Sequence, residues 1–425
     1  MHRLRLSASG AALNSMPAED LLWRPIGQAS SVDTTLGPRL EDLGHVPNLN
    51  IDFVRLAALV FFCDRTVERP WTLRRDFELE IAVSDPDSWS RQAGRLSALL
   101  SLLTGDAWAL HFARRRQPRL GEVASLPAHD VALLFSGGSD SACGAIAAHG
   151  EGLRPLAASH SDWKATAGSQ GRVLAALSKE TGNSLDQIYW RFGRIEKQVG
   201  SEADFSSEPT RRSRSLLFLA MGAAISGASG KPLWIAENGF TSLNPPLVPE
   251  SAGALSTRTT HPAFLRGMVE VLADLGVQLE LNNRFVELTK GEMFAEVKET
   301  LGGDRAADVL GATHSCGKPP QGVKGIAPAM HCGLCYGCLV RRSAFLTSGL
   351  ADSTLYADQK VAKSRRKRYL SPKRMATYSA LQYRLEVGFG EEDVLDLGLP
   401  DDANLDGALD LIQRGLTELA TVKIE

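Results

Sequence analysis

The amino-acid sequence predicts an α/β protein with a doubly wound parallel sheet, an N-terminal α+β extension and a helical C-terminal region. Two observations carry this prediction. From Asp130 onward, short apolar runs alternate with segments of helical periodicity, as in "VALLF" followed by "SACGAIAAHG", and such alternation is typical of βαβ units with parallel strands. The second observation is the glycine- and serine-rich run Ser136–Ser141, which follows the first strand. It falls at the sheet edge where α/β proteins bind their ligands.

Composition and charge narrow the class of protein. The chain has 425 residues, enough for two or three domains, and 44% of them are hydrophobic. There are 47 Lys and Arg residues against 49 Asp and Glu, so the net charge of −2 gives no overall attraction for nucleic acid or an anionic membrane. The first arginines are not followed by the apolar stretch of a signal peptide, and no apolar window reaches the ~20 residues that span a bilayer. We therefore expect a cytoplasmic protein.

Residues 1–127 are expected to form a separate N-terminal unit. The segments "NIDFVRLAALVFF" and "WTLRRDFELEIAVS" are rich in strand-forming residues and predict short strands and hairpins. The following "DSWSRQAGRLSALLSLLTG" predicts a helix from an N-cap at Asp87 to a stop at Gly105. The segment "FARRRQPRLGEVASLPAHD", further along the chain, has a run of charges and two prolines and is predicted to be a linker. The domain boundary is therefore expected near 115–128.

Residues 128–345 are expected to form the α/β core. Further strands are predicted in "LRPLAAS" and "PLWIAENG", and further helices in "GSQGRVLAALSKETG" and "RSLLFLAMGAAISGASG". Residues 346–425 are expected to be helical. Their basic run, Lys363–Arg374, could contact nucleic acid, but the acidic segments that follow favour a solvated surface or an interface with an acidic protein.

The loop after the first predicted strand has the chemistry of a phosphate site. Its glycines let backbone N–H groups approach a ligand, its serines add hydroxyl donors, and the next helix points its positive end at the same place. An acid among these donors would repel a phosphate unless it held a Mg²⁺ ion. The loop consists of Ser136, Gly137, Gly138, Ser139, Asp140 and Ser141. The alternative is a glycine-rich turn that binds nothing.

This S-G-G-x-D-S pattern between a strand and a helix resembles the PP-loop ATP pyrophosphatases. The resemblance implies that the chain cleaves ATP to AMP and pyrophosphate while adenylating a carboxylate or carbonyl oxygen. It also implies that the six loop residues bind ATP.

Four of the six cysteines crowd into one segment. Cys332, Cys335 and Cys338 have the spacing C-x₂-C-x₂-C, and Cys316 lies upstream of them. Four thiolates close a tetrahedral Zn²⁺ site without an open position, so the loop 316–338 is expected to bind a structural zinc ion. An iron–sulfur cluster is the alternative.

The cluster with its continuation "CGLCYGCLVRR" resembles the 7-cyano-7-deazaguanine synthases (QueC), as do "TKGEM" and "RSRSLLFLAMGAAI". This resemblance implies binding of ATP and 7-carboxy-7-deazaguanine, activation of the carboxylate as an acyl-adenylate, and transfer of the acyl group to an amine. In that family the zinc ion is structural.

The segments "ENG", "SLNPPL" and "LSTRTTHP", together with residues 1–127, instead resemble the QueC-like subunits of bacterial anti-phage systems, in particular the Qat system. That resemblance implies that the acyl acceptor is an amine of a partner protein from the same defence operon rather than ammonia. The alternative for residues 1–127 is that they stabilise a homodimer.

Further polar residues are candidates for the site. Lys290 would neutralise charge on the leaving pyrophosphate, and Arg214, with its neighbours Arg211 and Arg212, would bind phosphate or carboxylate. The candidates for nucleotide binding at the end of the second strand are Ser159, His160 and Asp162. Each has an ordinary structural alternative, such as a solvated charge at a helix start.

A second group of candidates would contact the substrate. Glu237 and Asn238 would read the edge of a guanine-like ring, and Arg258 would hold the carboxylate while His261 deprotonates the amine. A turn acid and a helix cap are the structural alternatives for Glu237 and His261. The remaining members of this group are Thr257, Thr259, Thr260 and Arg341.

Two other functions compete with acyl transfer. A PP-loop tRNA-modifying enzyme would need a basic RNA surface and a reactive cysteine, for which Cys143 is near the loop. A nucleotide-binding scaffold subunit of a defence complex would bind ATP without turnover, and the intact loop and Lys290 argue against it.

Overall fold

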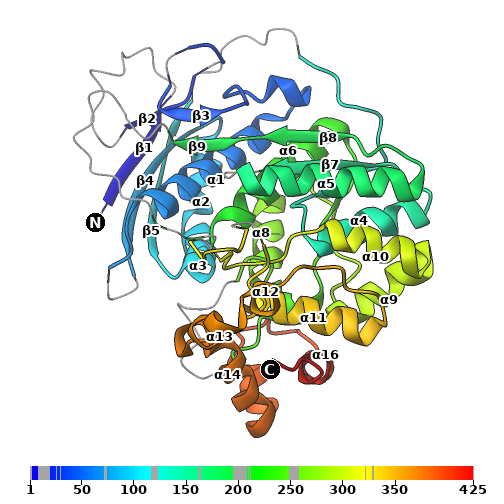
Figure 1. The fold of residues 1–425 in the computed structure, drawn as a ribbon. Coiled ribbons are helices and arrows are strands. Elements are labelled where there is room, and N and C mark those ends of the chain that lie inside the picture. Colours follow the sequence, from blue (N-terminus) through cyan, green and yellow to red (C-terminus); the bar gives the residue numbers. More distant parts are fainter. Residues whose placement is uncertain are drawn as a thin grey trace.

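A computed structural model gives the fold of the chain. It describes residues 2–7, 20–24, 26–28, 30–70, 74–115, 123–160, 164–194, 208, 210, 212–247, 258–320, 322–327 and 330–424. The strands of this part form a five-stranded sheet, a four-stranded sheet and a two-stranded ribbon (Figure 1).

The five-stranded sheet is parallel and has the order β11-β10-β6-β7-β8. Its strands are β6 (Val131–Leu134), β7 (Pro155–His160), β8 (Gln187–Trp190), β10 (Leu233–Trp234) and β11 (Leu281–Asn282). The chain starts at the central strand β6, proceeds outward through β7 and β8, and returns to the other side of β6 as β10. The strand order therefore reverses between β6 and β10, where such sheets form a ligand crevice.

Helices cover both faces of this sheet. Ala132 of β6 packs in the same cluster as helix α6 (Arg214–Ser229), whereas Leu133 packs with helices α4 (Ser139–Gly150) and α9 (Lys290–Leu301). Successive strand residues point to opposite faces, so these clusters lie on opposite sides. Helices α5 (Lys164–Thr181) and α10 (Gly303–Ala312) belong to the α4 side. The parallel sheet with two helical layers confirms the α/β prediction.

The four-stranded sheet lies in the N-terminal unit and has the order β2-β1-β4-β5. Its strands are β2 (Asp20–Leu22), β1 (His2–Ser7), β4 (Asp76–Val83) and β5 (Ala107–Arg114). All of these strands pair in parallel, so the predicted hairpins are wrong. The predicted linker is also wrong at its start, because residues 112–114 belong to β5.

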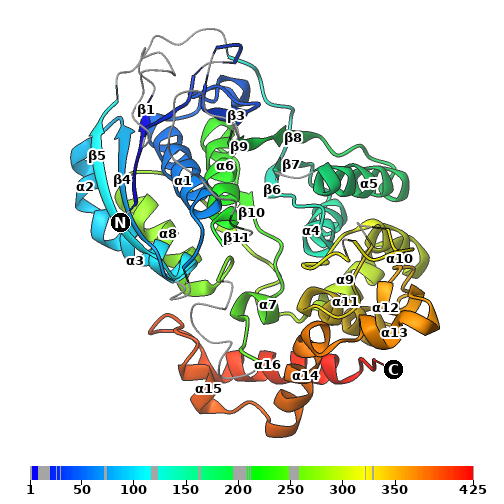
Figure 2. The ribbon, with the colours of Figure 1, turned by 60° about the vertical axis from the view of Figure 1, so that its left-hand side comes forward.

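The segment predicted as a strand, "NIDFVRLAALVFF", is instead the N-terminal part of helix α1 (Asn48–Thr66). Nearly every residue of α1 is buried, because the helix lies between the N-terminal sheet and α6 (Figure 2). A helix that is buried on all sides is apolar on all sides, so its sequence lacks the amphipathic period that distinguishes helix from strand.

The single helix predicted after β4 is two helices. Asp85, rather than Asp87, caps α2 (Pro86–Arg91), and α3 (Ala93–Thr104) follows it. The predicted stop is confirmed, because Gly105 ends α3 with φ 77°, a conformation that favours glycine.

The N-terminal unit and the core share one hydrophobic cluster, which contains Phe53 and Phe62 of α1 as well as Leu216 and Ile225 of α6. A strand pair also joins the two parts: β3 (Val32–Thr34) of the N-terminal unit pairs with β9 (Phe192–Arg194) of the core. Packing is therefore continuous across the predicted boundary near 115–128. The division into 1–127, 128–345 and 346–425 stays a prediction.

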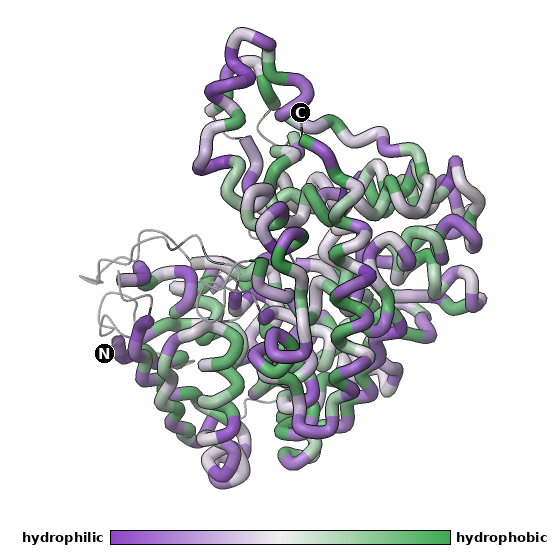
Figure 3. The backbone as a smooth tube through the Cα atoms, turned by 90° about the horizontal axis from the view of Figure 1, so that it is seen from below, coloured by the Kyte–Doolittle hydropathy of each residue, from purple (hydrophilic) through white to green (hydrophobic). Residues whose placement is uncertain are grey.

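The remaining α-helices are α7 (Gly239–Leu243), α8 (Pro262–Asp274), α11 (Tyr336–Ser348), α12 (Ala357–Lys360), α13 (Lys363–Tyr369), α14 (Pro372–Val387), α15 (Glu391–Leu395) and α16 (Leu405–Ala420). Helices α11 to α16 lie on the side of the molecule that carries the C-terminus, whereas α8 lies beside α3 (Figure 2). Hydrophobic and hydrophilic residues alternate at short intervals along the chain trace (Figure 3). Within the described ranges, no helix combines the length and apolar character that crossing a membrane requires.

Candidate active site

The loop between β6 and α4 has the backbone geometry expected for a phosphate site. Gly137 has φ 78°, and a Cβ atom there would lie 2.8 Å from Cγ of Gln170, so a side chain is excluded by both conformation and space. The Ser141 hydroxyl donates to the Gly138 carbonyl oxygen (3.0 Å) at the start of α4. The first-turn N–H groups of α4 therefore face the switch point between β6 and β10.

Asp140 is the acid of this loop and forms an ion pair with Lys290. The Lys290 Nζ lies 2.6 Å from the Asp140 Oδ2, and the side-chain amide of Asn238 donates to Oδ1 at 3.1 Å. These three residues come from α4, the start of α9 and the turn after β10. The fold thus brings to Asp140 two residues that lie 98 and 150 positions further along the sequence.

The start of α9 is held from two directions. Thr289 and Glu292 form a capping box around the first turn. Glu418 of α16 accepts hydrogen bonds from the Thr289 hydroxyl and from the Gly291 N–H group (3.0 Å). The C-terminal region therefore contributes to the position of Lys290.

Glu237 follows β10 and is a second carboxyl group at the same place. Burial raises its pKa to about 8; the negative charge of Asp140 adds to this shift and the positive charge of Lys290 opposes it. Glu237 is consequently mostly protonated at neutral pH and able both to donate and to accept a hydrogen bond.

A cavity of about 240 Å³ opens between the phosphate loop and Glu237. One wall is apolar, formed by residues such as Phe218 and Leu265, and the polar lining comes from four segments of the chain. The polar residues are Ser136, Ser141, Arg214, Ser215, Glu237, Thr259 and Thr260. An apolar lining with a few convergent polar groups suits a heteroaromatic ring with an anionic substituent.

A larger cavity, about 540 Å³, lies at the opposite edge of the sheet, beside the turns α4–β7 and α5–β8. It contains none of the candidate residues, so the smaller cavity is the better candidate for the reaction.

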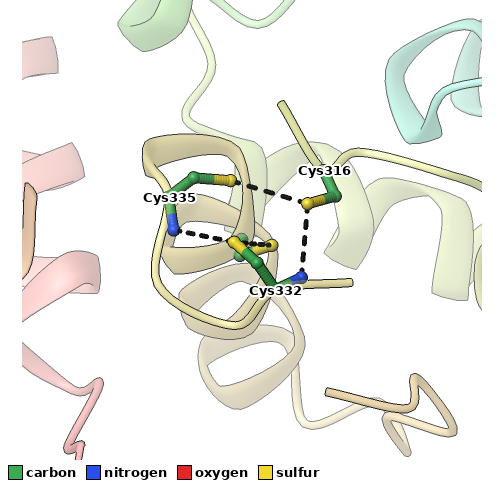
Figure 4. A group of neighbouring side chains, drawn as sticks. Cys316, Cys332 and Cys335 are labelled. Atoms are coloured by element: carbon green, nitrogen blue, oxygen red, sulfur yellow. Dashed lines mark hydrogen bonds between the residues drawn. The ribbon is translucent and has the colours of Figure 1, made fainter. Parts of the chain in front are cut away.

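The four clustered cysteines converge as the spacing predicts, and Figure 4 shows three of them, Cys316, Cys332 and Cys335. Their sulfur atoms lie within 4.8 Å of one another, with 3.9 Å between Cys316 and Cys335 and 3.8 Å between Cys332 and Cys338. Zn–S bonds of ~2.3 Å in a tetrahedron place sulfur atoms about 3.8 Å apart. The N–H groups of Leu334 and Cys335 donate to the Cys332 sulfur. The residues therefore fit a closed four-thiolate zinc site.

Comparisons with known proteins agree with this geometry. The 7-cyano-7-deazaguanine synthase 1 of Sphingopyxis alaskensis is 35% identical over 104 residues, which are 23% of this chain and 41% of that protein. The 7-cyano-7-deazaguanine synthase of Geobacter metallireducens is 26% identical over 244 residues, which are 53% of this chain and 92% of that protein. The chain is QueC-like in sequence. No family model and no solved structure matches it.

The cysteine loop of this QueC-like chain contacts the phosphate loop directly. The His314 N–H donates to the Gly137 carbonyl oxygen (3.2 Å), and the Ser315 hydroxyl lies 3.3 Å from that of Ser139. Both residues directly precede Cys316. No sequence motif marks His314 and Ser315 as part of the site, although their position beside the first cysteine of the cluster is a usable signal. A metal ion in the cysteine cluster would therefore also stabilise the phosphate loop.

The candidates at the end of β7 are buried. Ser159 and His160 have no exposed surface, and the His160 ring packs edge-on against Phe61 and Phe218. The Arg214 side chain donates to the His160 carbonyl oxygen at 3.4 Å. Only Arg214 of this group lines the cavity, and the nucleotide-binding role of Ser159 and His160 stays a prediction.

Structural contacts occupy several other candidates. His261 caps α8, its Nδ1 accepting from the Ala263 N–H (3.3 Å), and burial lowers its pKa to about 4. The geometry therefore supports a helix cap as the role of His261, which was the structural alternative to deprotonating the amine. Neither His261 nor Arg258 lines the cavity, whereas Thr259 and Thr260 do.

Arg341 is fully buried and donates to Thr313, Thr354 and the Leu310 carbonyl oxygen. It lies away from the cavity lining, and these contacts give it a structural role in place of the expected substrate contact. Arg212 donates to the Thr104 carbonyl oxygen in the N-terminal unit. The candidates Asp162, Arg211 and Thr257 lie outside the described residues.

Cys143 is buried within α4, and burial raises the pKa of its thiol well above the ordinary value. Such a thiol forms little thiolate at neutral pH. This finding disfavours the tRNA-modifying alternative, which needed a reactive cysteine near the loop.

Proposed function

We propose that this chain uses ATP to adenylate the carboxylate of a 7-carboxy-7-deazaguanine-type substrate and then transfers the acyl group to an amine. The observation that carries the proposal is the S-G-G-S-D-S loop at the switch point of the sheet. Beside it lie the Asp140–Lys290 ion pair and the cavity of about 240 Å³ that Glu237 lines. The names of the two relatives support the choice of a deazaguanine.

The first step would be attack of a substrate carboxylate oxygen on the α-phosphorus of ATP. An O–P bond forms to give an acyl-adenylate, and the bond to pyrophosphate breaks. The loop N–H groups and the serine hydroxyls would bind the phosphate oxygens, and Lys290 would neutralise the charge that builds on the leaving pyrophosphate. In the second step the amine nitrogen attacks the acyl carbon, AMP leaves, and the nitrogen loses a proton to give an amide.

Asp140 would be the Mg²⁺ ligand in this scheme. Such an ion, when bound, neutralises phosphate charge. Binding of ATP and Mg²⁺ would separate Lys290 from Asp140, because the ammonium group and the ion compete for the same carboxylate.

The deazaguanine ring would occupy the cavity between Phe218 and Leu265. A protonated Glu237 has both a donor and an acceptor for the polar edge of such a ring, and Arg214 has the charge to hold its carboxylate.

The acceptor in our proposal is an amine of a partner protein, and the setting is anti-phage defence. The resemblance of "SLNPPL" and "LSTRTTHP" to QueC-like defence subunits supports this assignment. The alternative acceptor is ammonia, which the names of the two relatives favour.

The test incubates the full chain with ATP, Mg²⁺ and 7-carboxy-7-deazaguanine and identifies the nucleotide products. We expect AMP and pyrophosphate, and no products from Asp140→Ala. The matched control is Asp130→Ala, an acid at the opposite end of β6 that pairs with Arg154 on the surface. ADP and phosphate as the only products would reject adenylation.

A further inference from the structure

The N-terminal unit reaches the candidate site through a cluster of buried charges. Asp64, near the end of α1, and Asp106, before β5, pair with Arg69 and Arg75, and none of these four side chains is more than 7% exposed. Two carboxylates thus face two guanidinium groups. Burial alone would lower the pKa of Arg75, but its hydrogen bonds and ion pairs with Asp106 and Asp64 outweigh burial and raise it.

Asp64 connects this cluster to helix α6. Its Oδ1 accepts from Arg75 at 2.6 Å, while its Oδ2 accepts from the Ser213 N–H (3.1 Å) and the Ser213 hydroxyl (2.7 Å). Thr210 also donates to Oδ2, at 3.3 Å. Ser213 immediately precedes α6, so a carboxylate of the N-terminal unit acts at the start of a core helix.

Other contacts hold the same segment. Arg65 donates to the Thr210 carbonyl oxygen at 3.1 Å, and Arg212 donates to the Thr104 carbonyl oxygen at 2.7 Å. Both contacts join the N-terminal unit to the residues just before α6.

The far end of α6 is held by the beginning of α1. The side-chain amide of Asn50 donates to the Ala223 carbonyl oxygen at 2.7 Å, and a Cβ atom on Gly227 would lie 2.8 Å from the Asn50 Nδ2. The two helices therefore run antiparallel in close contact and are joined at both ends. This leaves α6 little freedom to turn or slide.

The first turn of α6 supplies part of the candidate site. Arg214 and Ser215 line the cavity together with Ser136 of the phosphate loop. The Arg214 guanidinium lies 5.3 Å from the centre of the Phe218 ring, one turn further along the helix. The placement of this guanidinium thus depends on where α6 begins.

We propose that Asp64 is a positioning residue for the candidate site: it fixes the start of α6 so that Arg214 and Ser215 meet the anionic part of the nucleotide or of the acyl substrate. The inference rests on the proposed function. It makes the N-terminal unit part of the substrate site, whether or not that unit also docks a partner protein.

The test compares Ser213→Ala, Asp64→Asn and Asp52→Asn in the full chain. Ser213→Ala removes one hydrogen bond without unpairing a charge, so it is the variant expected to fold normally. Asp52 is the matched control, because it is a fully buried acid of α1 that accepts from the Ser84 N–H (2.7 Å) and pairs with Arg115 (3.2 Å). In the described part of the chain, none of its contacts reaches α6.

We expect Ser213→Ala and Asp64→Asn to raise the KM for ATP or for the acid substrate by about tenfold and to change kcat by less than about threefold, because ground-state and transition-state binding weaken equally. Asp52→Asn should leave both KM values within about twofold of the wild-type values. Equal KM values in all four proteins would overturn the proposal. If Asp64→Asn does not fold, Ser213→Ala decides the question.

Amide hydrogen exchange gives a readout that needs no substrate. Peptides covering the first turn of α6 should lose protection in Asp64→Asn and Ser213→Ala but not in Asp52→Asn. Unchanged protection would also overturn the proposal. A wild-type chain that does not cleave ATP would reject the proposed function alone, since exchange would still report whether Asp64 orders the start of α6.

Discussion

At the scale of single residues, the site contains two carboxyl groups in different electrostatic states. Asp140 forms an ion pair at 2.6 Å, whereas Glu237 is half-buried, forms no ion pair within the described residues, and has a pKa raised to about 8. Different roles follow from the two environments, since an ionised carboxylate binds Mg²⁺ and a protonated one can donate a hydrogen bond. The positive charge of Lys290 acts on both groups: it pairs with Asp140 and lowers the pKa of Glu237 from the value that burial alone would give.

Replacing Lys290 with Met should lower the rate of pyrophosphate release by about 100-fold or more, because removal of one preorganised charge partner costs about 10²–10³ in kcat in other enzymes. The measurement is a coupled assay of pyrophosphate at saturating ATP. Lys298→Met is the control, since Lys298 lies on the same helix and donates to the Ser348 carbonyl oxygen instead. A rate within threefold of wild type for Lys290→Met would exclude a role for this cation in the chemical step.

Glu237 should make stability depend on pH. Its pKa is about 4.5 in the unfolded chain and about 8 in the folded one, so the folded state binds the proton more tightly. The stability from the protonated carboxyl group is complete below pH 4.5 and is lost as the pH rises through 8. Glu237→Gln stays neutral at every pH. As the pH rises from 5 to 8, its free energy of unfolding should therefore increase relative to that of wild type, by up to about 4 kcal/mol.

Denaturant unfolding at several pH values measures this difference. Glu299→Gln, an exposed acid on α9, is the control and should track wild type. A difference between Glu237→Gln and wild type that does not change with pH would contradict the predicted ionisation.

At the scale of elements, the sequence was most informative where structure is local. The six residues of the phosphate loop are consecutive and the four clustered cysteines lie within one short segment, 316–338, so the sequence alone predicted both groups. Helix α1 was predicted as a strand, because a helix enclosed on every side shows no polar face. Contacts such as Asp64 with Ser213 join residues 149 positions apart, and no local pattern marks them.

The cysteine loop is an element whose order should depend on a metal ion. Cys332→Ser should reduce zinc from one ion per chain to none and yield insoluble protein or a melting temperature lower by at least about 10 °C, because closed zinc sites supply folding free energy. Elemental analysis and thermal denaturation check both results. Cys63→Ser, at a buried cysteine outside the cluster, should keep its zinc. Iron and sulfide in the purified protein would contradict a zinc site.

At the scale of the whole molecule, the candidate site depends on regions outside the predicted core. Asp64 of the N-terminal unit acts on the start of α6, and Glu418 of α16 acts on the start of α9. Residues from both predicted flanking regions, 1–127 and 346–425, therefore contact the helices that carry the candidate site.

The proposed acceptor leads to a prediction for the complete system. Incubation of the chain with ATP, 7-carboxy-7-deazaguanine and a protein encoded beside it should increase the intact mass of that protein by the mass of the acyl group. Positioning a protein amine beside the acyl-adenylate can supply about 7–11 kcal/mol of the barrier reduction, which makes capture faster than hydrolysis. Full turnover with ammonia and an unchanged partner mass would identify the small-molecule reaction instead.

The contact between Glu418 and the first turn of α9 also bears on how the protein is made. Gly291 and Glu418 are 127 positions apart, and a ribosome adding ~5–20 residues per second needs roughly 6–25 s to cover that distance. During this interval the nascent chain already contains the phosphate loop and Lys290 but lacks the carboxylate that holds the start of α9. Under the proposed function, the growing polypeptide should therefore be unable to form an acyl-adenylate until α16 has been synthesised and has docked.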